Sequence, residues 1–384
     1  MRILHTSDWH LGRQLHRVLL LAEQRAFLEH LLDTVQQERV EAVVVAGDVF
    51  DRAIPPLDAM DLFKWILEEL ANLQVPLIMI SGNHDSPRRL GVNSRLIEHA
   101  GIHLRTDVED CARPVILQDE HGPVAFYGLP YLEPGLVHAH FGAERASHHA
   151  VLSAAMDQVR SDLATRPSGT RSVVLAHAFV TGADTSDSER DITAGGVPSV
   201  PASVFDEADY VALGHLHRCQ KISDRIRYSG SPLAYSFSEA DYPKAMWLVD
   251  LGPGTAITTR KLLCPVPYSL RQVTGTLHDL LNSAEYTEHE ANWLHITLSD
   301  PDRPHMAMER LRERFPHALK LSFPQQHQPD ADSYRSRVQG RTDHEITLGF
   351  LHHVTGIPAT RAEQDLLQEG LEKVRTEAAA REAN

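Results

Sequence analysis

A buried strand that stops at a cluster of metal-binding side chains is the strongest structural signal in this sequence. Residues 75–80 read Val-Pro-Leu-Ile-Met-Ile, and Ser-Gly-Asn-His-Asp follows at once at residues 81–85. A short apolar run bounded by turn-forming residues is typical of a strand that is covered on both faces of a sheet. An amide, an imidazole and a carboxylate therefore meet at the carboxyl end of a strand, which predicts a metal site there.

Two earlier apolar runs end in the same way. Residues 2–5 lead into Asp8 and His10, and residues 42–46 lead into Asp48. Helical patterns of apolar residues separate these runs from one another. The resulting βαβαβ order predicts a parallel sheet, and its three strands deliver their polar groups to one rim.

Two later runs also end at histidine. Residues 172–176 lead into His177, and residues 210–213 lead into His215 and His217. The other histidines, such as the pair at residues 148–149, lie on predicted helices without partner ligands, so we expect them to be ordinary surface or helix residues.

The remaining pattern predicts a second sheet and two further units. Short strands replace the helical pattern at residues 103–127, and runs at residues 225–229 and 245–251 are expected to complete the second sheet. After a boundary at residues 264–267, a small α+β domain is predicted from a strand, helix, strand, helix and strand at residues 270–273, 277–282, 293–298, 306–315 and 319–323. A polar stretch at 325–341 then precedes two predicted helices, at 345–354 and 361–377.

Composition limits the possible partners and the compartment. The net charge of -15 argues against a generally basic surface for nucleic acid, so a polyanionic substrate would need metal ions or a partner to attract it. No apolar run reaches the roughly 18 residues of a membrane span, and no signal-peptide pattern follows Met1, so we expect a cytoplasmic protein without membrane contact. The three cysteines are scattered and are expected to be reduced.

The converging side chains favour a pair of metal ions. Two carboxylates, an amide and several imidazoles suit manganese, iron or zinc better than calcium. They are also too many for one ion. A dinuclear site with a bridging carboxylate is typical of two-metal phosphoester hydrolysis, in which the ions lie roughly 3.5–4 Å apart.

In this order and at strand ends, the motifs resemble the five-motif pattern of the calcineurin-like metallophosphoesterases. The resemblance implies an α/β fold of two stacked mixed β-sheets flanked by helices, in four layers. It implies one metal ion on Asp8, His10, Asp48 and His217 and a second on Asp48, Asn83, His177 and His215, with Asp48 as the bridge. It also implies that His84, which is not a ligand, binds the scissile phosphate or protonates the leaving oxygen, and that Asp51 orients His84.

Within that superfamily the chain is most similar to the SbcD family, the nuclease subunits of bacterial SbcCD complexes. Two marks lie outside the metal ligands: Ser-Asp-Ser-Glu-Arg-Asp at residues 186–191 and Tyr-Ser-Gly-Ser-Pro at residues 228–232. The resemblance implies a manganese-dependent DNA nuclease of repair, recombination and replication. Such a nuclease has exonuclease activity on duplex ends and endonuclease activity on single strands and hairpins.

The same resemblance implies how the chain is divided. Residues 1–266 would form the nuclease domain, residues 267–340 a DNA-capping domain, and residues 341–384 a helix pair that docks on the coiled coil of the SMC-like ATPase SbcC. The assembly would be a homodimer within a heterotetramer. The apolar residues expected to face the ATPase are Phe350, Val354, Leu367 and Leu371.

Several alternatives stay open. Gly-Asp-Val-Phe-Asp-Arg at residues 47–52 also resembles a motif of Ser/Thr phosphatases, so a cyclic-nucleotide or protein phosphatase is the rival enzyme. An assembly subunit with a lapsed site is a rival of another class. Arg88 and Arg89 either contact a phosphate backbone or form a solvated helix face. Asp85 either has a role in the metal site or caps the helix near residue 87. The apolar faces of the last two helices either contact a partner or belong to the core.

Overall fold

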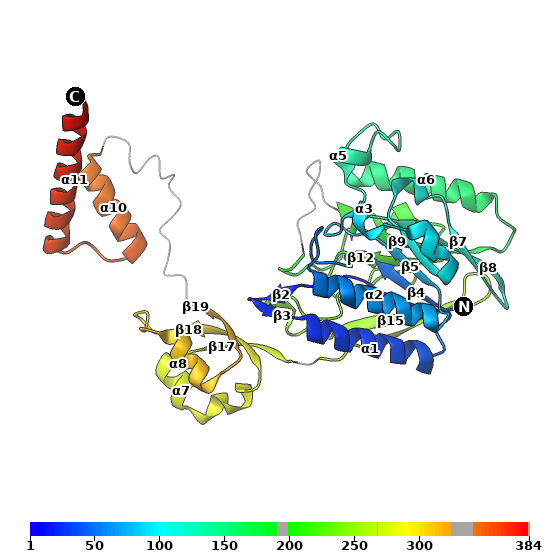
Figure 1. Cartoon of the computed structure of the whole chain (residues 1–384), viewed down its shortest axis with the longest axis horizontal. Coiled ribbons are helices and arrows are strands. Elements are labelled where there is room, and N and C mark those ends of the chain that lie inside the picture. Colours follow the sequence, from blue (N-terminus) through cyan, green and yellow to red (C-terminus); the bar gives the residue numbers. More distant parts are fainter. Residues whose placement is uncertain (190–198, 267, 324–340, 383–384) are drawn as a thin grey trace.

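Two six-stranded mixed sheets stack face to face in the computed structural model, which describes residues 1–189, 199–266, 268–323 and 341–382 (Figure 1). The first sheet has four parallel strands and two antiparallel strands at one edge. Its order is β16 (Ile257–Leu263), β15 (Ala245–Leu251), β1 (Arg2–Thr6), β4 (Ala42–Ala46), β5 (Leu77–Ile80) and β6 (Ile102–Arg105).

The second sheet has a parallel centre and an antiparallel strand at each edge. Its order is β13 (Gln220–Lys221), β14 (Ile226–Tyr228), β12 (Tyr210–Gly214), β9 (Arg171–His177), β8 (Gly122–Leu129) and β7 (Val115–Asp119). The predicted fold class, two stacked mixed sheets flanked by helices, is confirmed.

The expected membership of the two sheets was wrong at two strands, β15 and β6. Residues 245–251 were expected in the second sheet, but β15 pairs antiparallel with β1 in the first, with Ile3 opposite Val249. Residues 102–105 likewise form β6 of the first sheet. An apolar run predicts that a strand is buried, but the choice of neighbour depends on contacts between segments far apart in the chain.

The alternation of side chains along each central strand explains the layers. Val43 and Val45 of β4 pack under α1 (Leu21–Gln37) and α2 (Leu57–Asn72), whereas Ala42 and Val44 point into the core shared with the second sheet. Strands with both faces covered need a continuous apolar sequence, which is why these runs lack alternation. On the far side α6 (His148–Ala164) covers the second sheet (Figure 1).

Shorter elements connect these layers. The short helices and strands are β2 (Gln14–Leu15), β3 (Val18–Leu19), α3 (Pro87–Leu90), α4 (Ser94–Ile97), α5 (Pro134–Val137), β10 (Phe179–Val180) and β11 (Ser199–Val200). The 3-10 turns are η1 (Glu98–Ala100), η2 (Val108–Asp110), η3 (Ala202–Phe205), η4 (Phe237–Glu239) and η5 (Ala284–His289). Cys111, Cys219 and Cys264 are buried free thiols, as expected.

A small domain follows with its own core. Its elements are β17 (Leu270–Gly275), α7 (Leu277–Asn282), β18 (Trp293–Leu298), α8 (Ala307–Arg314) and β19 (Ala318–Ser322), and the three strands are parallel. Leu280, Ile296 and Leu311 lie in the core of this domain. A separate apolar cluster joins the domain to the first one, since Leu270 and Trp293 pack in one cluster with Leu15, Leu20, Leu233, Tyr235 and Phe237.

Two helices end the chain, α10 (Asp343–Thr355) and α11 (Arg361–Glu382), and they pack against each other (Figure 1). A capping box between Thr342 and Glu345 begins α10, and Gly356, with a φ of 72°, ends it. Phe350 and Val354 of α10 are 56% and 64% exposed. Among the described helices, none is both long and apolar enough to cross a membrane.

Candidate metal centre

The predicted ligands follow the carboxyl ends of β1, β4, β5, β9 and β12, which are central strands of the two stacked sheets. The strand registers bring these ends together: Ala46 pairs with Ile80 in the first sheet, and Gly214 pairs with His177 in the second. Hydrogen bonds then tie the loops to one another, because the main-chain N–H of Asp8 donates to the carbonyl of Gly47 at 3.0 Å. The sequence expectation that these ends share one rim is confirmed.

Asp48 lies at the middle of the cluster. Its Oδ2 lies 3.6 Å from Nε2 of His10 on one side and 3.5 Å from Nε2 of His177 on the other. Its Oδ1 accepts a hydrogen bond from the main-chain N–H of His84 at 2.9 Å, which fixes the carboxylate. A carboxylate with imidazoles on both sides has the geometry that a bridging ligand needs.

The other predicted ligands complete two groups around Asp48. On one side Nε2 of His10 faces Nε2 of His217 at 3.1 Å, and Asp8 lies in the same donor group. On the other side Oδ1 of Asn83 lies 2.8 Å from Nε2 of His177 and 3.3 Å from Nδ1 of His215.

The donors fit borderline divalent ions. Asp8, His10 and His217 offer ligand atoms within 4.8 Å of one another, and so do Asp8, Asp48 and His177. Buried imidazoles and carboxylates with an amide oxygen are the mixture that manganese, iron and zinc accept. The two groups share Asp8, and the second contains Asp48, so these buried donors are consistent with a dinuclear site.

Burial sets the protonation of several of these groups. It lowers the pKa of His10 and of His215 well below the usual value, so both rings are neutral near pH 7 and have a lone pair for a metal. Burial opposes ionisation of Asp48, but the neighbouring histidines, His177 first, outweigh it and lower the pKa of that carboxyl. Metal ligation requires neutral histidines and ionised carboxylates, and His10, His215 and Asp48 are already in these states. At His177 burial lowers the pKa, but the Asp48 carboxylate outweighs it and raises that pKa to about 9, so a metal ion that binds this ring has to displace a proton.

The loops that carry the ligands have strained backbones. Asp8, His10, Asp48 and His215 have φ values of 53°, 45°, 49° and 98°. Such left-handed conformations cost non-glycine residues of the order of 1–3 kcal/mol each, and they persist where the surrounding structure imposes them. Residue 82 is a glycine for a steric reason, since a Cβ at this position would overlap Oδ1 of Asp48.

His84 lies beside the cluster, and its ring contacts the main chain of Asp51. Nδ1 of His84 donates to the main-chain carbonyl of Asp51 at 2.9 Å, and Nε2 lies 4.0 Å from Oδ2 of Asp48. The carboxylate of Asp51 accepts from Arg13 at 3.2 Å instead. The contact between Asp51 and His84 is therefore made by the main chain of Asp51. His84 also forms a donor group with His10 and Asp48.

Asp85 joins two of the loops. Its carboxylate accepts from the main-chain N–H groups of Val49, Phe50 and Gly82 at 2.9–3.0 Å. Ser86 is the N-cap of α3, and its side chain makes no capping hydrogen bond. Of the two roles left open for Asp85, helix capping is not observed, and the carboxylate instead fixes the loop after β4 against the loop after β5.

Sequence reasoning missed the residues that support the ligands from behind. Glu239 and Lys244 form a buried ion pair, and Glu239 Oε1 lies 3.4 Å from Nδ1 of His217. Ser188 Oγ lies 2.5 Å from the same Nδ1. The motif at residues 186–191 was the only signal for this layer. Its first four residues fall in the described part of the chain, and its last two lie outside it.

A cavity of about 820 Å³ lies beside the cluster. It is lined by Asn83, Arg88, Tyr131, Glu133 and other residues of the loops after β5 and β8. Of the two arginines singled out in the sequence, Arg88 therefore faces the space next to a predicted ligand.

Comparisons with known proteins agree with this geometry. Residues 1–219 match the family model described as calcineurin-like phosphoesterase. Residues 266–354 match an SbcD-type model described as the type 5 capsule protein repressor C-terminal domain.

Three solved structures are similar to about two thirds of the chain. TT1561 of Thermus thermophilus is 14% identical over 68% of this chain and 98% of that one, with a TM-score of 0.39. A protein described as a novel archaeal phosphodiesterase is 13% identical over 68% and 100%, with a TM-score of 0.32. A dimetal phosphatase from Danio rerio is 16% identical over 68% and 98%, with a TM-score of 0.38.

Proposed function

Because this chain belongs to the calcineurin-like phosphoesterase family and carries an SbcD-type C-terminal domain, we propose that it is a two-metal DNA nuclease. It acts as an exonuclease on duplex ends and as an endonuclease on single strands and hairpins. Its partner is an SbcC-type ATPase, with which a homodimer of this chain forms a heterotetramer in DNA repair and recombination.

The position of Asp48 is the observation that carries the proposal. Its Oδ2 lies between His10 and His177, at 3.6 and 3.5 Å from their Nε2 atoms, as a bridge between two ions requires. One ion would be held by Asp8, His10, Asp48 and His217, and the other by Asp48, Asn83, His177 and His215. When bound, two such ions polarise a phosphodiester and promote attack by water. We assign manganese to both sites.

His84 supplies the proton. Its Nδ1 donates to the Asp51 carbonyl, so the ring is fixed with Nε2 directed toward the cluster. A protonated Nε2 in that position donates to the leaving oxygen or to a phosphate oxygen. Groups of this kind contribute about 10²–10⁴-fold to turnover. Asp51 acts as a positioning residue.

The remaining parts of the chain support a DNA substrate and a partner. We divide the chain into a nuclease domain (1–266), a DNA-capping domain (267–340) and a partner-binding helix pair (341–384). The small domain has its own core, yet it packs beside the β2–β3 hairpin, which follows the His10 loop. The net charge of -15 is compatible with DNA binding if the ATPase supplies the basic surface.

A phosphodiesterase or phosphatase with another substrate is the alternative function. The motif at residues 47–52 favours it, because Ser/Thr phosphatases have a similar one. The SbcD-type match over residues 266–354 favours the nuclease.

The test is cleavage of hairpin and linear duplex DNA, with and without manganese and the ATPase, beside hydrolysis of a small chromogenic phosphodiester. We expect metal-dependent cleavage of both DNAs. Hydrolysis of the small diester without cleavage of either DNA would support the alternative.

Asp48→Ala should abolish both activities and reduce bound metal to well below two ions per chain, whereas Asp61→Ala, on the exposed face of α2, should change neither. Two ions retained by Asp48→Ala would refute the bridge.

A further inference from the structure

His217 is enclosed on the side away from the metal cluster by two segments that contribute no predicted ligand. Nδ1 of His217 lies 2.5 Å from Ser188 Oγ, and this hydroxyl donates in turn to Oε1 of Glu239. The main-chain N–H of His217 donates to Oε1 of Glu189 at 2.8 Å. The segment around Ser188 and the turn η4 therefore hold one imidazole from behind.

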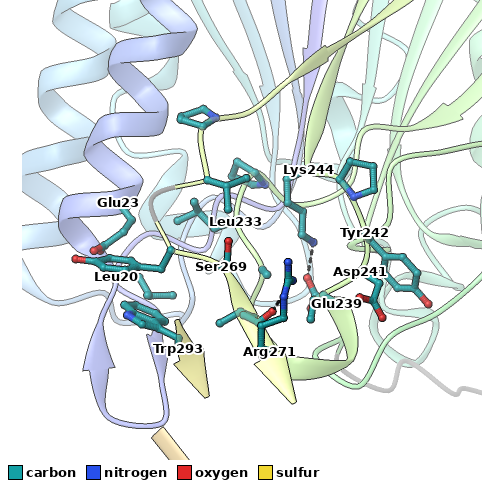
Figure 2. Close-up of a pocket in the computed structure, with 18 residues that line it drawn as sticks. Leu20, Glu23, Leu233, Glu239, Asp241, Tyr242, Lys244, Ser269, Arg271 and Trp293 are labelled. Carbon is teal, nitrogen blue, oxygen red and sulfur yellow. Dashed lines mark hydrogen bonds and ion pairs between the residues drawn. The ribbon is translucent and has the colours of Figure 1, made fainter. Parts of the chain in front are cut away.

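Glu239 is itself firmly held. It is only 1% exposed, and its Oε2 pairs with Lys244 Nζ, which is also buried. Lys244 Nζ further donates to the carbonyl of His217 at 3.0 Å and to Ser231 Oγ at 2.9 Å. Figure 2 shows the pair at the wall of a cavity of about 390 Å³ between the nuclease domain and the small domain. A buried carboxylate is tolerated when a charged partner and hydrogen bonds satisfy it, and here both are present.

The turn that carries Glu239 is also fixed from the side of the small domain. Gln272 Nε2 of β17 donates to the carbonyl of Phe237 at 3.2 Å. The ring of Phe237 packs against the ring of His295 of β18, with centroids 5.4 Å apart. Glu239 is therefore anchored by Lys244 on one side and by the small domain on the other.

We propose that Glu239, through Ser188, is a positioning residue that keeps the proton of His217 on Nδ1 and so leaves Nε2 free to bind metal. A neutral imidazole has one N–H, and the tautomer is set by the acceptor that this N–H finds. Here Ser188 Oγ accepts from Nδ1–H while donating to Glu239, and Nε2 faces Nε2 of His10 at 3.1 Å. This inference rests on the proposed metal site, and it extends the ligand set to residues that the ligand motifs do not contain.

The test is Mn²⁺ titration of the metal-free full chain by calorimetry, comparing wild type with Glu239→Gln. Losing a partner that orients a metal-bound histidine typically weakens metal affinity about 10–100-fold. We therefore expect one of the two ions to bind about 10–100-fold more weakly and the other to bind as in wild type. Glu98→Gln is the matched control, since Glu98 pairs with Arg105 away from the cluster, and it should leave both affinities unchanged.

A second variant covers the case in which Glu239→Gln fails to fold because Lys244 loses its partner. Glu239→Leu combined with Lys244→Met removes both buried charges and the acceptor of the Ser188 hydroxyl, and it should show the same loss for one ion. Unchanged affinity for both ions in either folded variant would overturn the inference. So would equal weakening of both ions together with a lower melting temperature of the metal-free protein, because that result indicates a general structural role. Wild type binding fewer than two ions would instead refute the dinuclear site, and this inference with it.

Discussion

His84 and Asp48 are neighbours, but the proposed chemistry gives them separable roles. His84→Ala should keep both metal ions, because the seven proposed ligands remain, and should lose about 10²–10⁴-fold in turnover as the proton donor disappears. Metal content by elemental analysis and turnover of a small phosphodiester measure the two effects independently. His121→Ala is the control, because His121 lies in the turn between β7 and β8 and pairs with Glu120, and it should alter neither quantity.

The opposite outcome for His84 is well defined. His84, His10 and Asp48 lie close enough together to form a donor group of their own. If His84→Ala released an ion, His84 would be a ligand, and the proton would have to come from another group.

Single residues show where the sequence was sufficient and where it was not. The strand-end positions of Asp8, Asn83 and His177 could be predicted because a buried strand has a local pattern and its end is marked in the chain. Glu239 could not, because it lies in a short 3-10 turn and reaches His217 only through the tertiary fold. The orientation of Asp51 was also beyond prediction, since Arg13 competes for its carboxylate.

At the scale of elements, the helix pair at the end of the chain gives a sharp prediction. Phe350 and Val354 are exposed on one face of α10, at i and i+4, whereas Leu367 and Leu371 are half-buried. Short helices are marginal alone, so an exposed apolar face of this kind favours a partner. Phe350→Asp combined with Val354→Asp should abolish co-purification with the SbcC-type ATPase and leave the melting temperature and manganese-dependent activity unchanged.

His352→Asp is the matched control for that variant. It introduces the same charge in the same helix, at an exposed residue two positions from each of the others and so on a different face. It should leave co-purification intact. Binding retained by the double variant would place the contact elsewhere, whereas an insoluble double variant would show that this face belongs to the core.

The elements themselves were predictable in proportion to their periodicity. The order of strands and helices in the small domain matches the prediction, because each element has its own apolar pattern and its own turn signals. Strand β16 was missed, because it is an edge strand whose Thr, Arg and Lys residues are largely exposed. The place of β15 in the first sheet depends on β1, which lies more than two hundred residues earlier in the chain.

At the scale of the whole molecule, a buried ion pair of the second sheet is hydrogen-bonded to the first sheet. The guanidinium of Arg171 on β9 pairs with Asp119 on β7 and donates to the carbonyl of Leu251 on β15 at 3.0 Å. Both charged side chains are at most 4% exposed. Asp119→Asn leaves the Arg171 charge without its partner, and it also removes the carboxylate that lies 2.6 Å from the N-terminal ammonium of Met1. Breaking a buried pair in this way typically costs about 3–5 kcal/mol. Urea unfolding at pH 7 should show a decrease of that size in the free energy of unfolding.

Asp224→Asn is the control, because Asp224 pairs with Lys221 on the surface and its side chain is 90% exposed. This variant should change the free energy of unfolding by too little to measure. If both variants unfolded at the same urea concentration as wild type, the Arg171 pair would have no part in holding the sheets together.

The same pair predicts a dependence on pH. Burial would raise the pKa of Asp119, but the hydrogen bonds from Arg171 and from the N-terminal ammonium of Met1 outweigh it and hold that pKa well below the usual value of 3.8. A carboxyl whose pKa is lower in the folded than in the unfolded state binds more protons when unfolded. Its stabilisation is therefore complete above about pH 4 and declines as the pH falls toward the folded pKa. Between about pH 4 and lower pH, the free energy of unfolding of wild type should fall more steeply than that of Asp119→Asn, which has no carboxyl at this position. Equal slopes for the two proteins would mean that Asp119 titrates alike in the folded and unfolded states and that neither Arg171 nor the N-terminal ammonium stabilises its ionised form.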